Sequence, residues 1–178
     1  NVEAVISSSQ AEIEKADKLI LPGVGHFKKG MENLKSLNLV KILNKKVLEE
    51  KTPILGICLG IQLFTKHSEE GDVSGLGWID AETIKFSNSK LKIPHMGWNS
   101  IKIKKQNSIF SGINQDEQFY FVHSYYVVPK NRELISSTAS YGKEFVSSIR
   151  KDNIYGVQFH PEKSHSAGLA LLKNFVEV

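Results

Sequence analysis

The sequence has very little cysteine and no long apolar run. Cys58 is the only cysteine among 178 residues, so the chain cannot form an internal disulfide and nothing points to an oxidising compartment. The apolar stretch around it covers only residues 53–64, well short of the roughly 20 residues that cross a bilayer. The opening NVEAVISSSQ has neither the basic start nor the apolar centre of a secretory signal. We therefore expect a cytoplasmic protein that does not enter a membrane.

Concentrated charge is also scarce. The net charge is +4 and the isoelectric point is near 9.0, but the lysines are scattered along the chain. Aromatic residues are not interleaved with them, as they are on nucleic-acid-binding surfaces. Solvated helix faces and strand edges account for most of this charge, so we expect no nucleic-acid partner. Docking to an acidic protein surface is the alternative.

The order of apolar segments predicts an α/β fold. Short apolar runs alternate with helical patterns in the first half, which implies parallel strands joined by helices. The strands are expected at 3–7, 18–25 and 52–57, and the helices at 8–17 (with a capping box of Ser9 and Glu12), at 27–50 (broken near Asn38) and at 59–67.

The second half is typical of closely spaced strands. Strand patterns cover 75–86, 92–103, 118–128, 134–141 and 144–160, the last with a hairpin turn at RKDN. A closing amphipathic helix would be capped by Ser164 or Ser166. With no repeat or linker, residues 1–178 are expected to form one domain, with a mostly parallel central sheet, flanking helices and an added antiparallel region.

The surroundings of Cys58 indicate a nucleophile. In PILGICLGIQLF the cysteine lies where a buried strand meets a helix, with Gly56 and Gly60 two positions before and after it. Small residues at these positions permit the sharp turn of a nucleophile elbow. A helix N-terminus would also favour the thiolate over the thiol. The alternative is a small buried side chain beside two packing glycines.

Among the six histidines, His160 has the most informative context. In IYGVQFHPEKS the imidazole lies at the end of a strand that Pro161 stops. Glu162, two residues on, would lie on the same side and could orient the imidazole, as in a catalytic triad. The alternative is a strand-end histidine beside a surface glutamate. A third segment, LPGVGHF, could aim a backbone N–H at a developing negative charge, or could be an ordinary turn.

Together these motifs resemble the class I, triad-type glutamine amidotransferases. The match rests on PILGICLGIQLF and GVQFHPEKS, and LPGVGHF, KIPHMGWN and FYFVHSYY narrow it to the glutaminase subunits of imidazole glycerol phosphate synthase. The resemblance covers essentially the whole chain and implies a flavodoxin-like fold. Family members usually begin with a further strand, a DYGxGN segment and a helix, so the resemblance implies that this chain lacks that first strand and helix.

The resemblance implies hydrolysis of glutamine to glutamate and ammonia without metal or cofactor. Cys58 would attack the carboxamide carbon, and His160, oriented by Glu162, would protonate the departing ammonia and activate water. It implies further roles for three groups of residues: Leu59, Gly23, Val24 and Gly25 at the oxyanion; Gln62, His123, Ser124 and Tyr125 at the substrate; and Lys163, Tyr120 and Trp98 at a partner interface.

The implied partner is a barrel-type cyclase subunit, which forms a heterodimer with the glutaminase and uses its ammonia in histidine biosynthesis. Two other enzymes remain possible from the sequence: a paralogue that supplies ammonia for amidino-sugars of surface polysaccharides, and a γ-glutamyl cysteine hydrolase. A degenerate binding subunit is disfavoured because Cys58, His160 and Glu162 are all present. For Trp98 a core position, and for Lys163 a free surface charge, are the alternatives to an interface.

Overall fold

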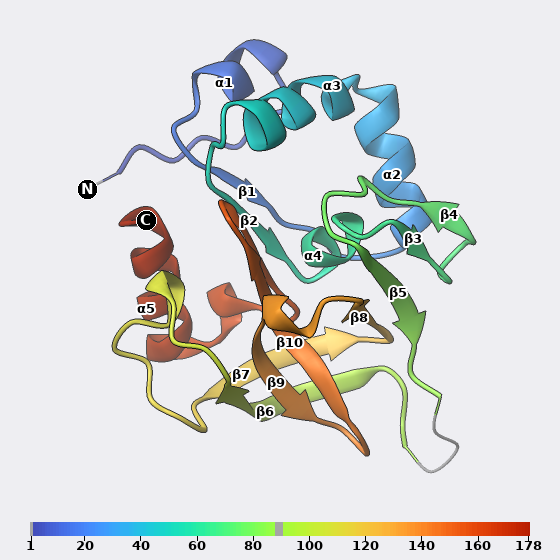
Figure 1. Ribbon diagram of the computed structural model, residues 1–178, viewed down its shortest axis with the longest axis vertical. Coiled ribbons are helices and arrows are strands. Elements are labelled where there is room, and N and C mark those ends of the chain that lie inside the picture. The colour runs from blue at the N-terminus through green and yellow to red at the C-terminus, as the bar shows by residue number, and fades with distance from the viewer. Residues whose placement is uncertain (1, 88–90) are drawn as a thin grey trace.

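A computed structural model describes residues 2–87 and 91–178 (Figure 1). Its first half contains α1 (Gln10–Lys15), β1 (Leu19–Leu21), α2 (Phe27–Ser36), α3 (Leu39–Asn44), a π-helical turn (Lys45–Glu49), β2 (Ile54–Ile57), α4 (Leu59–Leu63), β3 (His67–Ser68), β4 (Val73–Ser74) and β5 (Ala81–Lys85). Its second half contains β6 (His95–Ile103), β7 (Gln118–His123), β8 (Tyr125–Pro129), β9 (Ile135–Ser140), β10 (Glu144–Lys151), β11 (Ile154–Val157) and α5 (His165–Val176), with 3₁₀ turns at Ser108–Phe110, Arg132–Leu134 and Pro161–Lys163.

The described strands form a large mixed sheet and a smaller one. The large sheet has the order β1-β2-β11-β10-β9-β6-β7, with β1, β2 and β11 parallel and the remaining neighbours antiparallel. The smaller sheet has the order β4-β3-β5-β8. The expected α/β class with an antiparallel addition is confirmed, although parallel pairing in the large sheet is confined to the three strands at one end.

Two apolar cores cover the two faces of the large sheet. Ile54 and Ile154 pack with α2 and α3, whereas their neighbours Leu55 and Tyr155 pack with Phe175 of α5. Successive residues of a strand point to opposite faces, so the continuous apolar runs of β2 and β11 serve both cores. Figure 1 shows α1, α2 and α3 grouped on one side and α5 on the other.

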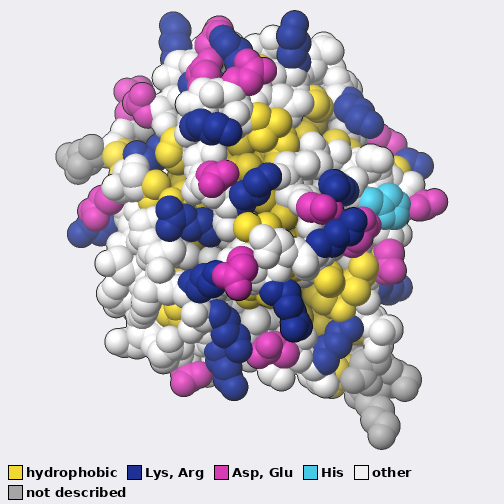
Figure 2. All heavy atoms as spheres, in the orientation of Figure 1, with side chains coloured by type: hydrophobic (Ala, Val, Ile, Leu, Met, Phe, Trp, Pro, Cys, Tyr) yellow, Lys and Arg dark blue, Asp and Glu magenta, His cyan; other side chains and the backbone are white. Residues whose placement is uncertain are grey.

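Several expected local structures are confirmed. The helical segment after residue 27 breaks at Asn38, which adopts a left-handed conformation (φ 55°). The RKDN turn joins β10 to β11, with Lys151 paired to Ile154 and Asp152 at φ 52°. Figure 2 shows basic and acidic side chains interspersed on one face, as expected for solvated charge.

The strand expected at 3–7 is not formed. Its backbone is irregular, and Val5 and Ile6 are exposed. A strand needs a hydrogen-bonding neighbour, and this segment pairs with none of the described strands. The capping box of α1 is also absent. The Ser9 side chain makes no cap bond, and the backbone N–H of Ser9 donates to Ser7 Oγ (2.9 Å).

Three further expectations needed correction. The helix expected at 59–67 ends at Leu63, and His67 already belongs to β3, because the chain turns there to join the smaller sheet. The run 118–128 forms β7 and β8, which lie in different sheets on either side of Ser124. Ser164 precedes α5 without capping it, since its hydroxyl instead donates to the His160 carbonyl (2.6 Å) and accepts from the Tyr120 amide (3.0 Å).

Candidate active site

The carboxyl ends of the three parallel strands bring the predicted motifs to one edge. β2 lies between β1 and β11, with Leu21 opposite Gly56 and Ile57 opposite Val157. The loop with Gly23 therefore follows β1, Cys58 follows β2, and His160 comes three residues after the end of β11. This edge is where α/β sheets commonly bind small ligands.

The backbone of Cys58 makes a sharp, strained turn between β2 and α4. Its φ of 53° and ψ of −103° are rarely adopted by a non-glycine residue, and such a conformation costs roughly 1–3 kcal/mol. A Cβ on Gly56 would lie 2.5 Å from the Phe64 ring, and one on Gly60 would lie 1.8 Å from the Leu21 carbonyl oxygen. The two glycines are therefore required by the turn, as the spacing predicted.

The surroundings of Cys58 favour the thiol, contrary to the expectation of a favoured thiolate. Burial raises its pKa to about 12, and the nearby carboxylates of Glu162 and Glu70 raise it further, whereas the Leu59 N–H and the Gln158 amide lower it. α4 has only five residues, so its dipole is too small to offset the loss of water. The thiol donates weakly to the Val122 carbonyl (S···O 3.8 Å).

His160 and Glu162 form a close pair. The imidazole Nδ1 lies 2.6 Å from Glu162 Oε1, which orients the ring, and the histidine is buried while the carboxylate is half exposed. Within the described chain, His160 Nε2 has no hydrogen-bond partner although it is buried. A free, buried ring nitrogen with an oriented partner on the other side is suited to proton exchange with a ligand.

β7 places Cys58 and His160 near each other. The His160 N–H donates to the Tyr120 carbonyl (2.8 Å), and the Cys58 thiol contacts the Val122 carbonyl of the same strand. Two residues of a strand span about 7 Å. The backbone of His160 and the sulfur of Cys58 therefore contact the same short stretch of β7.

A cavity of about 320 Å³ opens beside Cys58. Most of the positions that the resemblance implied for substrate and oxyanion line it, whereas Gly23 and His160 are not among its lining residues. The lining residues from that set are Val24, Gly25, Leu59, Gln62, His123, Ser124 and Tyr125.

The residues implied at the oxyanion lie close together, but they differ in exposure and in the hydrogen bonds of their backbone groups. The Leu59 N–H donates to the Gly23 carbonyl (3.2 Å), so it is already bonded within the protein. Val24 is exposed at the mouth, and Gly25 has a φ of 107° that side-chain-bearing residues rarely adopt. Any oxyanion that used the Leu59 N–H would have to replace the Gly23 carbonyl.

The side-chain amide of Gln62 has a fixed orientation. Its nitrogen donates to the Tyr125 carbonyl (3.0 Å) and to Gln158 Oε1 (3.1 Å). Both N–H groups are thereby used, so the oxygen Oε1 is the atom left to accept a hydrogen bond from a ligand.

A chain of hydrogen bonds behind the cavity fixes the protonation of two buried histidines. The Tyr125 carbonyl can only accept, so His123 donates to it through Nδ1 (2.8 Å), and its Nε2 accepts from His95 Nδ1 (3.1 Å). His95 Nε2 then accepts from the amide of Asn99 (3.2 Å), which also donates to the Ser140 carbonyl (2.9 Å). Both ring nitrogens of His123 are thus engaged within the protein, and the residue lines the cavity as a neutral ring.

Burial keeps these two rings neutral. It lowers the pKa of His95 to about 4 and the pKa of His123 to about 3. A proton added to either ring would leave two N–H donors facing each other.

Two residues of the site were missed from the sequence. Glu70 lines the cavity and accepts from the Phe27 N–H (2.6 Å) at the start of α2, and Gln158 lies between Gln62 and Cys58. Glu70 belongs to the acidic run SEEGD, which on its own is typical of a solvated loop. Gln158 falls within the strand pattern of residues 144–160, which does not distinguish it from its neighbours. No local signal identified them, because tertiary packing brings them to the cavity.

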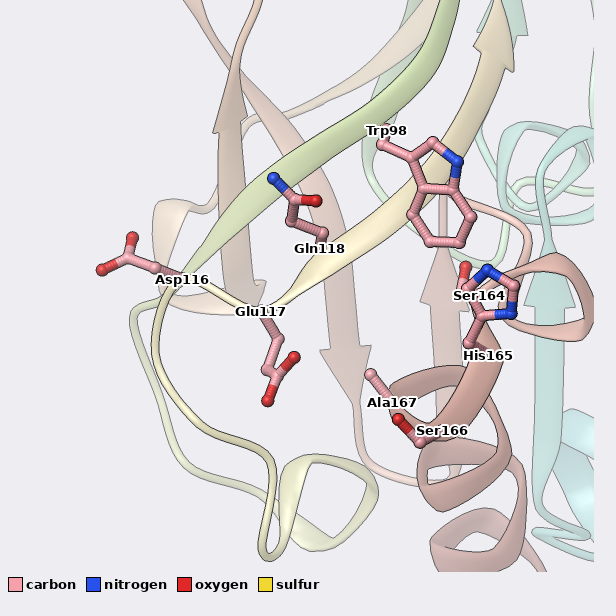
Figure 3. A pocket seen from close by; sticks show the side chains of 8 residues that line it. All are labelled: Trp98, Asp116, Glu117, Gln118, Ser164, His165, Ser166 and Ala167. Carbon is pink, nitrogen blue, oxygen red and sulfur yellow. The ribbon is translucent and has the colours of Figure 1, made fainter.

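The three residues implied at a partner interface form a cluster on β6, β7 and the turn before α5. Trp98 is paired with Tyr120 in register, their rings pack edge to face at 6.0 Å, and Lys163 Nζ lies 5.6 Å from the Tyr120 ring centre. Trp98 is 44% exposed and stacks flat on His165 at 4.8 Å, beside a second cavity (Figure 3). Trp98 is therefore a surface residue rather than a core residue.

Two features are absent from residues 2–87 and 91–178. No three or more histidine, cysteine or acidic side chains are grouped there so that they could hold a metal ion. Nor does any helix in those ranges have the length and apolar character needed to cross a membrane.

Comparison with known proteins defines the class. The family model for glutamine amidotransferase class-I matches residues 1–178, and the chain belongs to this family. A solved structure described as a glutamine amidotransferase has a similar fold, with a TM-score of 0.69 at 18% identity, over 99% of this chain and 86% of that one.

The relatives narrow the match. The chain is 54% identical over 176 residues to imidazole glycerol phosphate synthase subunit HisH 2 of Methanococcus maripaludis, covering 98% of this chain and 87% of that protein. It is 48% identical over 177 residues to the subunit HisH 2 of Pseudomonas aeruginosa, covering 99% and 88%.

Proposed function

We propose that this protein is the glutaminase subunit of imidazole glycerol phosphate synthase and supplies ammonia for histidine biosynthesis. The observation that carries the proposal is the cavity itself: one small space with Cys58 on its wall, the Gln62 oxygen as an acceptor and the Glu70 carboxylate nearby. The identity to two such subunits supports the histidine pathway over the amidino-sugar and hydrolase alternatives.

The substrate would be held by opposite charges and a fixed amide. Glutamine has an α-ammonium group and a carboxamide, both hydrogen-bond donors. The Glu70 carboxylate would pair with the ammonium group, and Gln62 Oε1 would accept from an N–H of the substrate. Ser124 and Tyr125 would form the facing wall, held by the bond from His123 to the Tyr125 carbonyl.

The reaction would pass through a glutamyl thioester. His160 Nε2 takes the thiol proton as the Cys58 sulfur attacks the carboxamide carbon, and the proton then leaves with ammonia. His160 next removes a proton from water, which attacks the thioester and releases glutamate and the thiol. Glu162 stabilises the imidazolium that forms in each half of the cycle.

Negative charge on the substrate oxygen needs support that the resting structure does not yet provide. The Leu59 N–H would stabilise the oxyanion only after its bond to the Gly23 carbonyl opens, which requires the Gly23–Val24–Gly25 loop to change conformation. The absence of a free Leu59 N–H supports low activity of the subunit alone and activation by a partner.

The partner would be a barrel-type cyclase subunit in the cytoplasm. Trp98, Tyr120 and Lys163 would lie at the interface of this heterodimer, because an exposed tryptophan packed against a second aromatic ring is typical of docking surfaces. The cluster adjoins His160, whose amide is bonded to Tyr120, so docking and catalysis share β7.

The test compares two nitrogen sources in the complex with the cyclase. Cys58→Ala should abolish synthesis from glutamine, with a loss of at least about 1,000-fold, while synthesis from ammonium salt stays at the wild-type rate. Equal loss from both sources would contradict the proposed role of Cys58. Failure of the wild-type chain to co-purify with the cyclase would contradict the proposed partner.

A further inference from the structure

Gln158 lies fully buried between two residues of the site. Its Oε1 accepts from Gln62 Nε2 (3.1 Å), and its Nε2 lies 3.8 Å from the Cys58 sulfur. Its backbone N–H donates to the Ser147 carbonyl (2.8 Å), which fixes the main chain from which the side chain extends. The proposed mechanism assigns this residue no role.

The direction of these bonds is determined by the surrounding groups. The Tyr125 carbonyl can only accept, so the nitrogen of Gln62 faces it. The second N–H of Gln62 points to Gln158, which must present its oxygen there and therefore its nitrogen to the sulfur. The series of hydrogen bonds that runs from the Tyr125 carbonyl through Gln62 and Gln158 thus ends with an N–H directed at the Cys58 sulfur.

This arrangement matters when the sulfur loses its proton. The thiol is a donor to the Val122 carbonyl, but a thiolate can only accept. The Gln158 N–H is then an available donor in a buried place where the carboxylates of Glu162 and Glu70 disfavour negative charge. The same amide fixes the orientation of the Gln62 side chain, which lines the cavity.

We propose that Gln158 is a positioning residue of the glutaminase site, which stabilises the Cys58 thiolate through its N–H and fixes the substrate-binding orientation of Gln62 through its oxygen. The inference rests on the proposed hydrolysis of glutamine for its kinetic consequences, but its effect on the sulfur is independent of turnover. A glutamate at this position would keep the acceptor for Gln62 and replace the N–H by a negative charge.

The test uses the single cysteine of the chain. The rate of alkylation by iodoacetamide, followed against pH by mass spectrometry of the intact protein, reports Cys58 without background from other thiols of this chain. For Gln158→Glu we expect the alkylation profile to move to higher pH by about one unit or more. At a given pH below the midpoint, this shift corresponds to an alkylation rate that is about tenfold lower. For Gln158→Met, which lacks the donor and carries no charge, we expect a smaller shift in the same direction.

Gln115 provides a matched control. Its side-chain oxygen accepts from the Ile103 N–H and its side-chain nitrogen donates to the Ile103 carbonyl (3.1 Å each), outside the cavity. Gln115→Glu loses the same kind of N–H donor and should keep the wild-type alkylation profile. Unchanged profiles in both Gln158 variants, with circular dichroism showing folded protein, would overturn the proposal.

Kinetics of the complex with the cyclase add a second readout. Gln158→Met should raise KM for glutamine, because Gln62 is no longer locked, and should lower kcat with glutamine while synthesis from ammonium salt is unchanged. A wild-type KM and kcat would contradict the positioning role. If wild-type protein does not hydrolyse glutamine, the proposed function fails, and the alkylation profiles still decide whether Gln158 controls the thiolate.

Discussion

The parallel end of the large sheet and its antiparallel end use glycine for different reasons. At the parallel end, a Cβ on Gly56, Gly60 or Gly156 would meet its nearest heavy atom at 2.5, 1.8 and 2.5 Å respectively. In the antiparallel region, Gly97 in β6 and Gly112 in the connection from β6 to β7 have open space around them and positive φ values of 126° and 69°. Glycine thus permits close packing of α4 on β1, β2 and β11 in the first region, and only a backbone conformation in the second.

This difference explains where the chemistry is concentrated. Close packing at the ends of β2 and β11 makes the turn at Cys58 sharp and keeps water from the sulfur, which is the reason that its pKa is raised. The antiparallel strands contribute a hydrogen-bonded network, in which Asn99, His95 and His123 hold the Tyr125 carbonyl on the cavity wall opposite Cys58. One region is strained and carries Cys58, while the other carries the buried histidines that face it.

The largest effect is expected from a substitution that disrupts the close packing at the parallel end of the sheet. Gly60→Ala should lower the free energy of unfolding by more than about 3 kcal/mol, because its methyl group would overlap the Leu21 carbonyl oxygen. Urea unfolding followed by circular dichroism measures this loss. Gly112→Ala, the control with open space, should cost about 1–2 kcal/mol through its positive φ alone. Similar losses in the two variants would contradict the comparison.

A smaller effect on stability, confined to acidic pH, tests the role of the buried histidines in the antiparallel region. The folded pKa values of His95 and His123 lie below their ordinary 6.5, so the unfolded chain binds more protons between about pH 4 and 6.5. The stability that the neutral rings contribute is present above pH 6.5 and decreases as pH falls through this window, by on the order of a few kcal/mol. Urea unfolding at several pH values measures the slope.

Two variants sharpen this test. His95→Gln should flatten the decrease of stability between pH 6.5 and 4, because one titrating ring is removed. His165→Gln, which changes an exposed ring, should leave the slope unchanged. A wild-type slope in His95→Gln would show that the buried pair does not control acid stability.

The sequence predicted local features well and long-range ones poorly. The elbow at Cys58 follows from two glycines and the pairing of His160 with Glu162 from a spacing of two residues, and the structure has both features. The position of Glu70 beside the cavity depends on how a surface loop packs against α2, which no local pattern records.

The expectations for the thiol pKa and for a strand at residues 3–7 were wrong for the same reason: both properties depend on the complete fold. A helix N-terminus was expected to favour the thiolate, but the burial that opposes it depends on the complete fold around Cys58. Residues 3–7 have the composition of a strand, yet strand formation depends on a neighbour that the described chain does not place there.

The central claim is that His160 exchanges a proton with Cys58. The most direct measurement is the rate at which a glutamine-analogue diazo-ketone labels Cys58 in the complex with the cyclase, in wild type and in His160→Asn. We expect labelling of the variant to be about 100-fold slower, since the proton acceptor of the thiol is lost. Labelling of both proteins at the same rate would contradict the claim.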